Sequence, residues 1–150
     1  MHRFCSLRSA IVMLFAAAVL TLPSVASAAE RAHRSRGTAE FLPNSTDFVG
    51  SGSATHLSRY EEVGSVTLWP TSDPTAIPLT AWSIYTARNG DELHATFEGY
   101  LNGVTGQITA TVTYIGGTGR YDGASGTGTL TGQMLPNGTI SVKVKGRIDY

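Results

Sequence analysis

The 150-residue sequence contains little charge and a single cysteine, Cys5. One cysteine cannot form an intramolecular disulfide, so a disulfide-stapled scaffold is excluded. Charged residues make up only 15% of the chain, and eleven basic residues balance eleven acidic ones. We therefore expect no binding of nucleic acid or of anionic membrane surfaces, because both depend on excess positive charge. Intrinsic disorder is also disfavoured, because 41% of the residues are hydrophobic.

Helical periodicity is missing after residue 28. No window places apolar residues at i, i+3, i+4 and i+7 over three turns. Glycine, threonine and β-branched residues dominate instead, and these residues favour turns and strands. The composition therefore indicates an all-β protein.

The first 28 residues have the three parts of a secretory signal peptide. The N-terminal segment contains Arg3 and Arg8 and no acidic residue. Residues 10–20 form an uninterrupted apolar run, and the small-residue triplet 26–28 follows. An apolar run of eleven residues is short for a bilayer span, which needs about 20. We predict cleavage after Ala28 and export to the periplasm or the extracellular space. An uncleaved membrane anchor is the alternative, but we expect no membrane span in the mature chain.

Removal of residues 1–28 leaves 122 residues with nine basic groups, eleven acidic groups and no cysteine. Export without disulfides fits a bacterial envelope better than an animal secretory pathway. A chain of this length can bury one adequate core, and we expect a single domain over residues 38–150. Residues 29–37 are polar and basic and lack periodicity, so we expect a flexible leader there.

Turn sequences divide the domain at short intervals. Asn-Gly pairs at 89–90, 102–103 and 137–138 are typical of tight hairpin turns, and Gly-Gly at 116–117 is a further break. Between the breaks, side chains alternate with period two, most clearly over residues 139–149. The pattern predicts about eight strands, at 38–42, 51–59, 62–69, 79–87, 92–100, 106–115, 125–134 and 139–149.

Eight short antiparallel strands joined by hairpins imply a closed barrel or a sandwich. We favour a single closed antiparallel β-barrel, because closure removes exposed strand edges. Glycines within the strands fit this fold, since small barrels need bends and bulges.

Two glycine-containing stretches carry a family resemblance. Residues 52–57 read Gly-Ser-Ala-Thr-His-Leu, and residues 116–128 read Gly-Gly-Thr-Gly-Arg-Tyr-Asp-Gly-Ala-Ser-Gly-Thr-Gly. The second stretch resembles the corner of allene-oxide-cyclase-like and dirigent-like β-barrels. It also resembles the corresponding stretch of a group of small exported bacterial proteins with a similar calycin-like fold. The resemblance spans about residues 50–150 and implies the barrel fold. The activity-bearing residues of those families have no matched positions here, so it implies no activity.

The second stretch also has a physical interpretation of its own. Glycine permits positive φ, so the chain can reverse sharply there. We expect residues 120–123 to form one helical turn or a compact loop, with Tyr121 packed over the end of the barrel. The predicted structural corner comprises Gly116, Gly117, Gly119, Arg120, Tyr121 and Gly123. A phosphate-binding loop is disfavoured, because neither a P-loop Lys-Ser/Thr pair nor a long helix follows.

Patterns that signal catalysis or metal binding are missing. No G-x-S-x-G nucleophile elbow occurs, and His56 and His94, the histidines of the expected domain, lack metal-ligand spacing. His94 and Glu98 share a strand face but lie about 13 Å apart at ~3.3 Å per residue. If Leu93 and Phe97 fill the core, that pair faces outward. We expect no metal and no cofactor, and we assign no catalytic residue.

An eight-stranded barrel is either filled by its own side chains or holds one small apolar ligand. The sequence pattern fits both a filled interior and a ligand-holding one. The candidate inward-facing residues are Trp82, Ile84, Phe97, Val112, Tyr114 and Leu130. The expected ligand-binding residues are His56, Trp82, Phe97 and Tyr114, with His56 and Tyr114 as the polar contacts.

We therefore expect a small secreted β-barrel protein with a binding or structural role, able to hold a small apolar ligand. One alternative is a barrel isomerase or cyclase that confines a hydrophobic substrate. Another is an envelope interaction or inhibitor module, or a homo-oligomer built through the barrel walls. The expectation leans away from an enzyme, because no catalytic constellation is recognisable.

Overall fold

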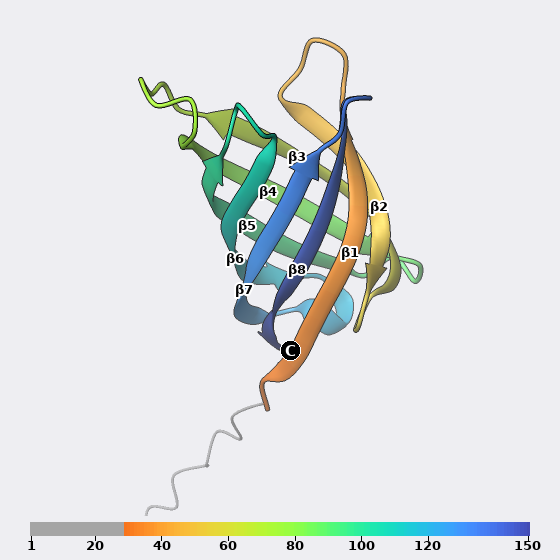
Figure 1. Ribbon diagram of the computed structural model, residues 1–150. Coiled ribbons are helices and arrows are strands. Elements are labelled where there is room, and N and C mark those ends of the chain that lie inside the picture. The colour runs from red at the N-terminus through yellow and green to blue at the C-terminus, as the bar shows by residue number, and fades with distance from the viewer. Residues whose placement is uncertain (1–28) are drawn as a thin grey trace, which may run out of the picture.

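The computed structural model describes residues 29–150, which form a closed barrel of eight antiparallel strands in sequence order (Figure 1). The predicted all-β barrel is confirmed. Within this range the remaining regular element is the 3-10 helix η1 (Gly119–Tyr121). The strands are β1 (Arg31–Phe41), β2 (Asp47–Ala54), β3 (Ser58–Leu68), β4 (Ile77–Ala87), β5 (Glu92–Leu101), β6 (Gln107–Gly117), β7 (Ser125–Met134) and β8 (Thr139–Asp149).

The predicted signal peptide, its cleavage site after Ala28 and Cys5 lie outside the described residues. In the described range, no helix has the length and apolar character needed to cross a membrane.

Period-two alternation orients the strands, as the last one illustrates. Ile140, Val144 and Ile148 of β8 are buried inside the barrel, whereas Lys143 and Lys145 are exposed outside. The first and last strands pair over ten residue positions, from Arg31–Ile148 to Glu40–Thr139, and this pairing closes the sheet. Closure leaves every strand paired along both edges, so no edge is open to aggregation.

The expectation of a flexible leader over residues 29–37 is wrong, because β1 begins at Arg31. Period two is present in this segment, but its inward positions are His33, Ser35 and Gly37, which are polar or small. A half-buried strand normally shows an apolar stripe, and this strand has none before Ala39. Pairing with β2 and β8 orders the segment instead.

The strand predicted over residues 51–59 is also wrong in its bounds, since the chain turns between β2 and β3 at residues 55–57. Thr55 secures this turn: its N–H donates to the Arg34 carbonyl at 2.9 Å, and its Oγ1 accepts from the Arg34 N–H at 3.0 Å. Ser58 then starts β3 in the left-handed region, with φ of 58°. The threonine thus continues the β1–β2 ladder without remaining in the strand.

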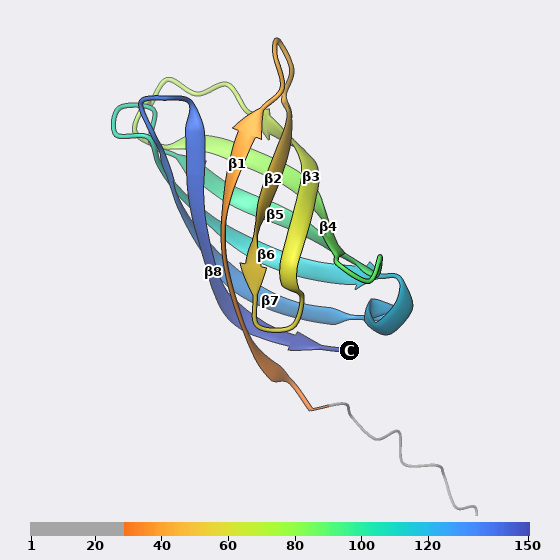
Figure 2. The same cartoon turned by 90° about the vertical axis from the view of Figure 1, so that its right-hand side faces the viewer.

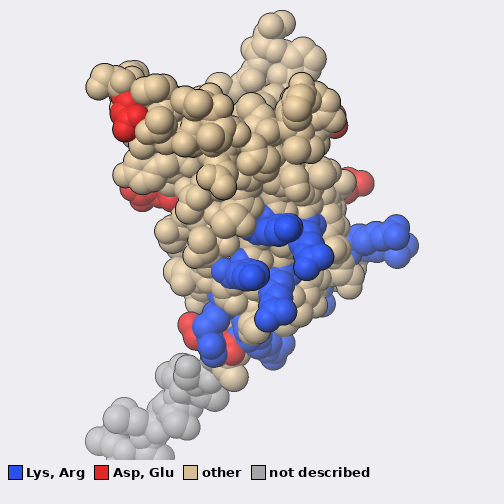
Figure 3. Space-filling model, in the orientation of Figure 1, with Lys and Arg blue, Asp and Glu red and all other residues tan. Residues whose placement is uncertain are grey.

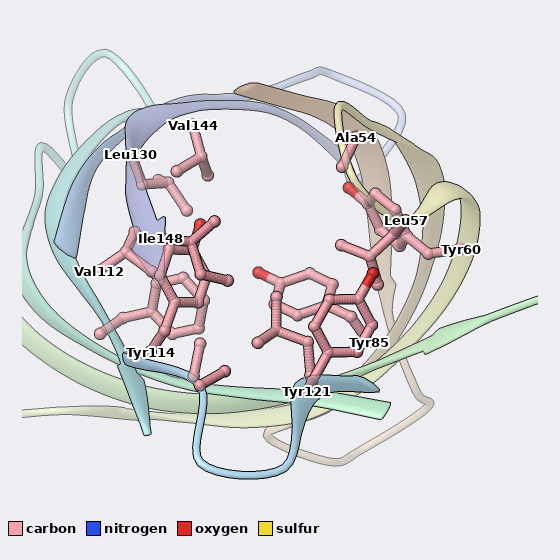
Figure 4. Close-up of a cluster of buried hydrophobic side chains, with 14 of the residues drawn as sticks. Ala54, Leu57, Tyr60, Tyr85, Val112, Tyr114, Tyr121, Leu130, Val144 and Ile148 are labelled. Carbon is pink, nitrogen blue, oxygen red and sulfur yellow. The ribbon is translucent and has the colours of Figure 1, made fainter. Parts of the chain in front are cut away.

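The barrel has two different ends, seen from the side in Figure 2. At the closed end lie the short connections 55–57 and 88–91, the corner 118–124 and the carboxyl end of β8. At the open end lie the connections 42–46, 69–76, 102–106 and 135–138. The buried core occupies the closed end, where large side chains from several strands point toward one another (Figure 4).

Candidate functional site

Interlocking aromatic rings shut the closed end of the barrel. His33 lies 5.9 Å from His56 and 5.1 Å from Tyr114, measured between ring centroids. Tyr150 lies 5.5 Å from His56 and 5.1 Å from Tyr121. Offset and edge-to-face aromatic pairs of this kind each contribute about 0.5–1.5 kcal/mol beyond area burial. We call these five residues the closed-end plug.

The glycine-rich corner holds the plug in position. Tyr121 of η1 is fully buried and its hydroxyl donates to the His56 carbonyl at 2.9 Å. The Arg120 guanidinium lies 4.9 Å from the centre of the Tyr121 ring, and it donates to the same carbonyl. Asp91 approaches Arg120 from the β4–β5 turn, at 3.9 Å between Oδ2 and Nε. The corner therefore acts as a structural cap.

The corner glycines serve two different purposes. Gly116, Gly119 and Gly123 have φ of 114°, 57° and 74°, which are left-handed values that L side chains rarely adopt. Gly117, where glycine also permits positive φ, does not have it. A Cβ at Gly117 would lie 1.9 Å from the Glu92 carbonyl oxygen. Close strand approach, rather than backbone conformation, requires glycine there.

An apolar cavity of about 140 Å³ lies between the plug and the open end. All eight strands contribute to its wall, so the cavity runs along the barrel interior. Its lining includes Phe41 and Leu68 at strand ends that reach the open end. The other apolar lining residues are Ala39, Phe48, Val66, Leu79, Ala81, Phe97, Leu101, Ile108, Ala110, Leu130, Met134, Ile140, Val142 and Val144.

A small polar cluster lies in this apolar wall. It comprises Ser35, Tyr60, Glu62, Ser83 and Tyr85. Glu62 is only 7% exposed, and its Oε1 accepts a hydrogen bond from the Ser83 hydroxyl at 2.6 Å. Tyr85 is the direct cross-strand partner of Glu62, and the Tyr60 and Tyr85 rings meet edge to face at 5.1 Å. Burial of a carboxyl is costly unless it is hydrogen-bonded, and this cluster supplies the partners.

Two glycines make room for the cluster. Gly37 of β1 and Gly52 of β2 are paired directly opposite each other. A Cβ at these positions would lie 2.7 Å and 2.5 Å from the Tyr60 hydroxyl oxygen, respectively. The Tyr60 side chain therefore lies flat against a stretch of wall that has no side chains of its own.

Burial changes the acid–base properties of the cluster. Burial raises the pKa of the Glu62 carboxyl, and hydrogen bonds from Ser83 and Tyr85 partly oppose this rise. Burial, together with the nearby Glu62 charge, raises the pKa of Tyr60 to about 12. The pKa of Tyr85 rises well above its ordinary value for the same two reasons. The tyrosines are therefore proton donors at neutral pH, whereas the carboxyl can accept a hydrogen bond or, once protonated, donate one.

The structure separates the four residues that we expected to bind a ligand. Phe97 lines the cavity. His56 and Tyr114 belong to the closed-end plug and do not line it. The expectation that Trp82 faces inward is wrong, because its side chain is outside the barrel and 47% exposed.

Strand β4 misled the prediction because it carries large apolar residues on both faces. Trp82 and Ile84 alternate with the buried Ser83 and Tyr85. The larger side chains suggested the wrong inward face. The remaining inward candidates, Val112 and Leu130, are buried, the second of them in the cavity wall.

Sequence reasoning missed Glu62, although a signal was present. Tyr60 and Glu62 share one face of β3 with Gly64, Val66 and Leu68, so a carboxylate stands in a mostly apolar stripe. The expected strand boundaries, ending one strand at 59 and beginning the next at 62, split this stripe. A correct turn at 55–57 would have revealed it.

The remaining candidates for chemistry lie on the surface. His94 and Glu98 face outward as expected, and His94 contacts Glu92 instead, at 3.1 Å between Nε2 and Oε2. Over residues 29–150, no group of three or more His, Cys, Asp or Glu side chains could hold a metal ion.

Exposed apolar side chains surround the open end. Each open-end connection, or the strand end beside it, exposes at least one large hydrophobic side chain. The closed-end connections expose none, although Ile115 near the closed end of β6 is exposed. The Trp69 indole is held in place by donation to the Thr80 hydroxyl at 3.2 Å. We call these residues the open-end rim: Phe41, Leu42, Leu68, Trp69, Val104 and Leu135.

Comparison of the chain with protein-family models, curated proteins and solved structures returned no match. The resemblance to allene-oxide-cyclase-like and dirigent-like barrels therefore stays a prediction from the glycine corner.

Proposed function

We propose that the barrel binds a small, mostly apolar molecule that carries one hydroxyl or carbonyl group. The observation that carries this proposal is the polar cluster around Glu62 in the wall of an otherwise apolar cavity. A well-packed apolar residue is often as stabilising as a buried polar group, or more so. A buried carboxyl beside empty apolar space is therefore better explained by a ligand than by stability.

The cavity sets the size and orientation of the ligand. Its volume of about 140 Å³ is close to that of a protein cavity of ~150 Å³ that takes benzene. The polar group of the ligand points to Glu62 and its apolar body toward the open end. A longer molecule extends through that end and contacts the open-end rim. Because the signal peptide predicts export, we place this binding in the bacterial envelope or outside the cell.

Size-matched probes test this proposal. Toluene and benzyl alcohol differ by one hydroxyl, and binding can be followed by methyl NMR of Leu130 and Ile140 in the cavity, with Ile148 as a closed-end reference. We expect Glu62→Leu to weaken benzyl alcohol binding about tenfold, the equivalent of one hydrogen bond, and to leave toluene binding unchanged or stronger. The matched control is Glu61→Leu, which removes the neighbouring exposed carboxylate.

Three results would contradict the proposal. The first is that neither probe shifts the cavity methyl resonances. The second is that the probes shift the Ile148 methyl as much as the cavity methyls. The third is that Glu61→Leu reproduces the effect of Glu62→Leu. Glu62→Gln provides a second variant in case the leucine substitution disturbs folding, which far-UV circular dichroism detects.

A second candidate is a barrel isomerase or cyclase, favoured by one specific observation. The carboxyl with the raised pKa lies beside the hydroxyl of its cross-strand partner Tyr85 in an apolar site. In such a site a carboxylate can remove a proton next to a carbonyl while a tyrosine hydroxyl donates to the carbonyl oxygen. Cyclohexanone in D2O reports this activity, since each proton removal exchanges an α-hydrogen for deuterium. Exchange that is lost in Glu62→Gln identifies an enzyme, whereas no exchange above buffer rejects it and leaves the binding function.

A further inference from the structure

One outer face of the barrel collects most of the positive charge. Six of the nine basic residues after position 28 are exposed at outward-facing positions of β8, β1 and the start of β3. Arg31, also exposed on β1, lies over the Tyr150 ring at the closed end instead. Figure 3 shows the cluster of Lys and Arg side chains on the lower half of the molecule, below an upper half almost free of them. We call these residues the basic face: Arg34, Arg36, Arg59, Lys143, Lys145 and Arg147.

The strand register brings like charges together on this face. Arg34 is directly opposite Lys145, and Arg36 is directly opposite Lys143. Like charges in directly opposed positions destabilise an antiparallel pair. Arg147 pairs with Glu30 at 2.6 Å, but the other five basic residues have no carboxylate within 4.0 Å in the described part of the chain. The fold gains no stability from this arrangement, which points to a function.

The near-zero net charge conceals the separation of basic and acidic residues on the barrel surface. Apart from the basic face and Glu30, residues 29–150 contain three basic and ten acidic residues. Basic side chains two apart on a strand are ~6.6 Å apart, and neighbouring strands are ~4.8 Å apart. The positive charges therefore form a regular array, which suits a polymer with repeated negative charges better than a single small anion.

A hollow of about 400 Å³ lies in the array, between β1, β2 and the start of β3. Its lining includes three arginines, Arg34, Arg36 and Arg59, and Ser53, which carries a hydroxyl. The Thr55 hydroxyl, also in the lining, is already bonded to the Arg34 backbone. Guanidinium groups pair with sulfate, phosphate or carboxylate oxygens through two parallel hydrogen bonds. A serine hydroxyl can both donate and accept, as sugar hydroxyls require.

We propose that the basic face binds an acidic polysaccharide, with one anionic group in the hollow and the chain running along the Lys and Arg rows of β8 and β1. This function is separate from ligand binding, because the cavity opens at the other end of the barrel. The face has no aromatic side chain on which a nucleic-acid base could stack, and no protruding helix or loop that could enter a duplex groove. It also has no exposed apolar side chain to insert into a bilayer, since the open-end rim lies elsewhere.

The test uses dextran sulfate as the acidic polysaccharide and uncharged dextran as its control, with the barrel of residues 29–150. We expect salt-sensitive binding to dextran sulfate alone. Arg36→Gln/Lys143→Gln weakens it at least tenfold and lowers the slope of log affinity against log salt by about 2, since two ionic contacts are lost. Thr109→Glu/Thr113→Glu on the outer face of β6 changes net charge by the same amount and leaves binding nearly unchanged. Removal of opposed like charges leaves the melting temperature of the glutamine variant unchanged or higher, which separates a binding role from a structural one.

Several outcomes overturn the proposal. Dextran sulfate fails to bind, or uncharged dextran binds equally well, or the two double variants lose affinity to the same extent. Tighter binding of duplex or single-stranded DNA than of dextran sulfate at equal charge concentration assigns the face to nucleic acid. Preferential sedimentation with phosphatidylcholine–phosphatidylglycerol vesicles assigns it to an anionic membrane.

Discussion

The two ends of this barrel are built from the same eight strands but differ in what fills them. At the closed end, Leu93, Val112, Tyr121 and Ile148 are almost completely buried, and the plug and corner lock the connections together. At the open end, small residues such as Ala39 and Ala81 leave a cavity, and the connections expose apolar side chains. Dense packing and empty apolar space are therefore segregated along one barrel axis.

The buried titratable groups differ in the same way. In the plug, burial and the nearby His56 lower the pKa of His33 to about 4, and its Nδ1 has no hydrogen-bond partner among the described residues. Beside the cavity, burial raises the pKa of Glu62. Both groups favour their neutral forms, so they have opposite effects on stability as the pH falls.

The largest expected effect on the free energy of unfolding comes from a substitution at the closed end. Tyr121→Ala removes a fully buried ring and its hydrogen bond to His56, and we expect a loss of about 3–5 kcal/mol in the free energy of unfolding. Tyr100→Ala removes the same side chain from an exposed site on β5 and is expected to stay within about 0.5 kcal/mol. Urea unfolding measures both. Equal losses would show that the plug is not the main source of stability.

The next effect uses pH to separate the two buried groups. Because the folded pKa of His33 lies below its ordinary 6.5, its contribution to stability is complete above about pH 6.5 and is lost as the pH falls toward 4. The loss is on the order of 3 kcal/mol. Glu62 has the opposite effect. Because its pKa is raised in the folded protein, the protein gains stability as the pH falls through that raised pKa.

Unfolding measurements between pH 7 and 4 in the Glu62→Gln background isolate the histidine. We expect His33→Leu to abolish the acid-side decline in stability. His94→Leu, a partly exposed histidine on the outer face of β5, should retain it. If His33→Leu keeps the full decline, His33 is not the group responsible.

A smaller effect compares the same substitution at the two ends. Ala95→Leu adds volume to the packed closed end, where Ala95 is 1% exposed, and overpacking should lower the free energy of unfolding by about 1–3 kcal/mol. Ala81→Leu adds the same volume to the cavity wall; we expect less than about 1 kcal/mol of destabilisation together with loss of benzyl alcohol binding. Thermal unfolding and methyl NMR give the two readouts. If Ala81→Leu destabilises as much as Ala95→Leu, the cavity is not usable space.

The smallest effect concerns the open-end rim. Trp69→Ser should change the free energy of unfolding by less than about 0.5 kcal/mol, yet weaken binding of 1-decanol, whose chain reaches the rim, by roughly 1 kcal/mol. The shorter 1-butanol should be unaffected. Trp82→Ser, a comparably exposed tryptophan on the barrel wall, is the matched control. Equal weakening by the two tryptophan variants would exclude a specific role for the rim.

Much of the fold was predictable because its signals are local. Asn-Gly turns and period-two alternation identified about eight strands and an all-β barrel, and the bounds of β7 and β8 agree with the expected ranges. The first strand was missed because its inward positions are polar or small and its order depends on pairing with β8, more than a hundred residues away. Only one of four expected ligand-binding residues, Phe97, lines the cavity. Period two does not say which face of a strand points inward, which misplaced Trp82. It also does not say which end of the barrel an inward side chain occupies, and Tyr114 lies in the closed-end plug.

By itself, the sequence determined that this chain forms antiparallel strands, where most of them turn, and that it carries almost no net charge. Tertiary structure alone decided that Glu62 lies beside an apolar cavity and that six basic residues form one face. The reason is physical: turn formation and alternation depend on neighbouring residues, whereas a cavity and a charged face arise only when barrel closure brings distant strands into register. A sum of charges over the chain does not depend on that register, so the even balance between acidic and basic residues concealed this surface. On it, five cations have no carboxylate partner among residues 29–150.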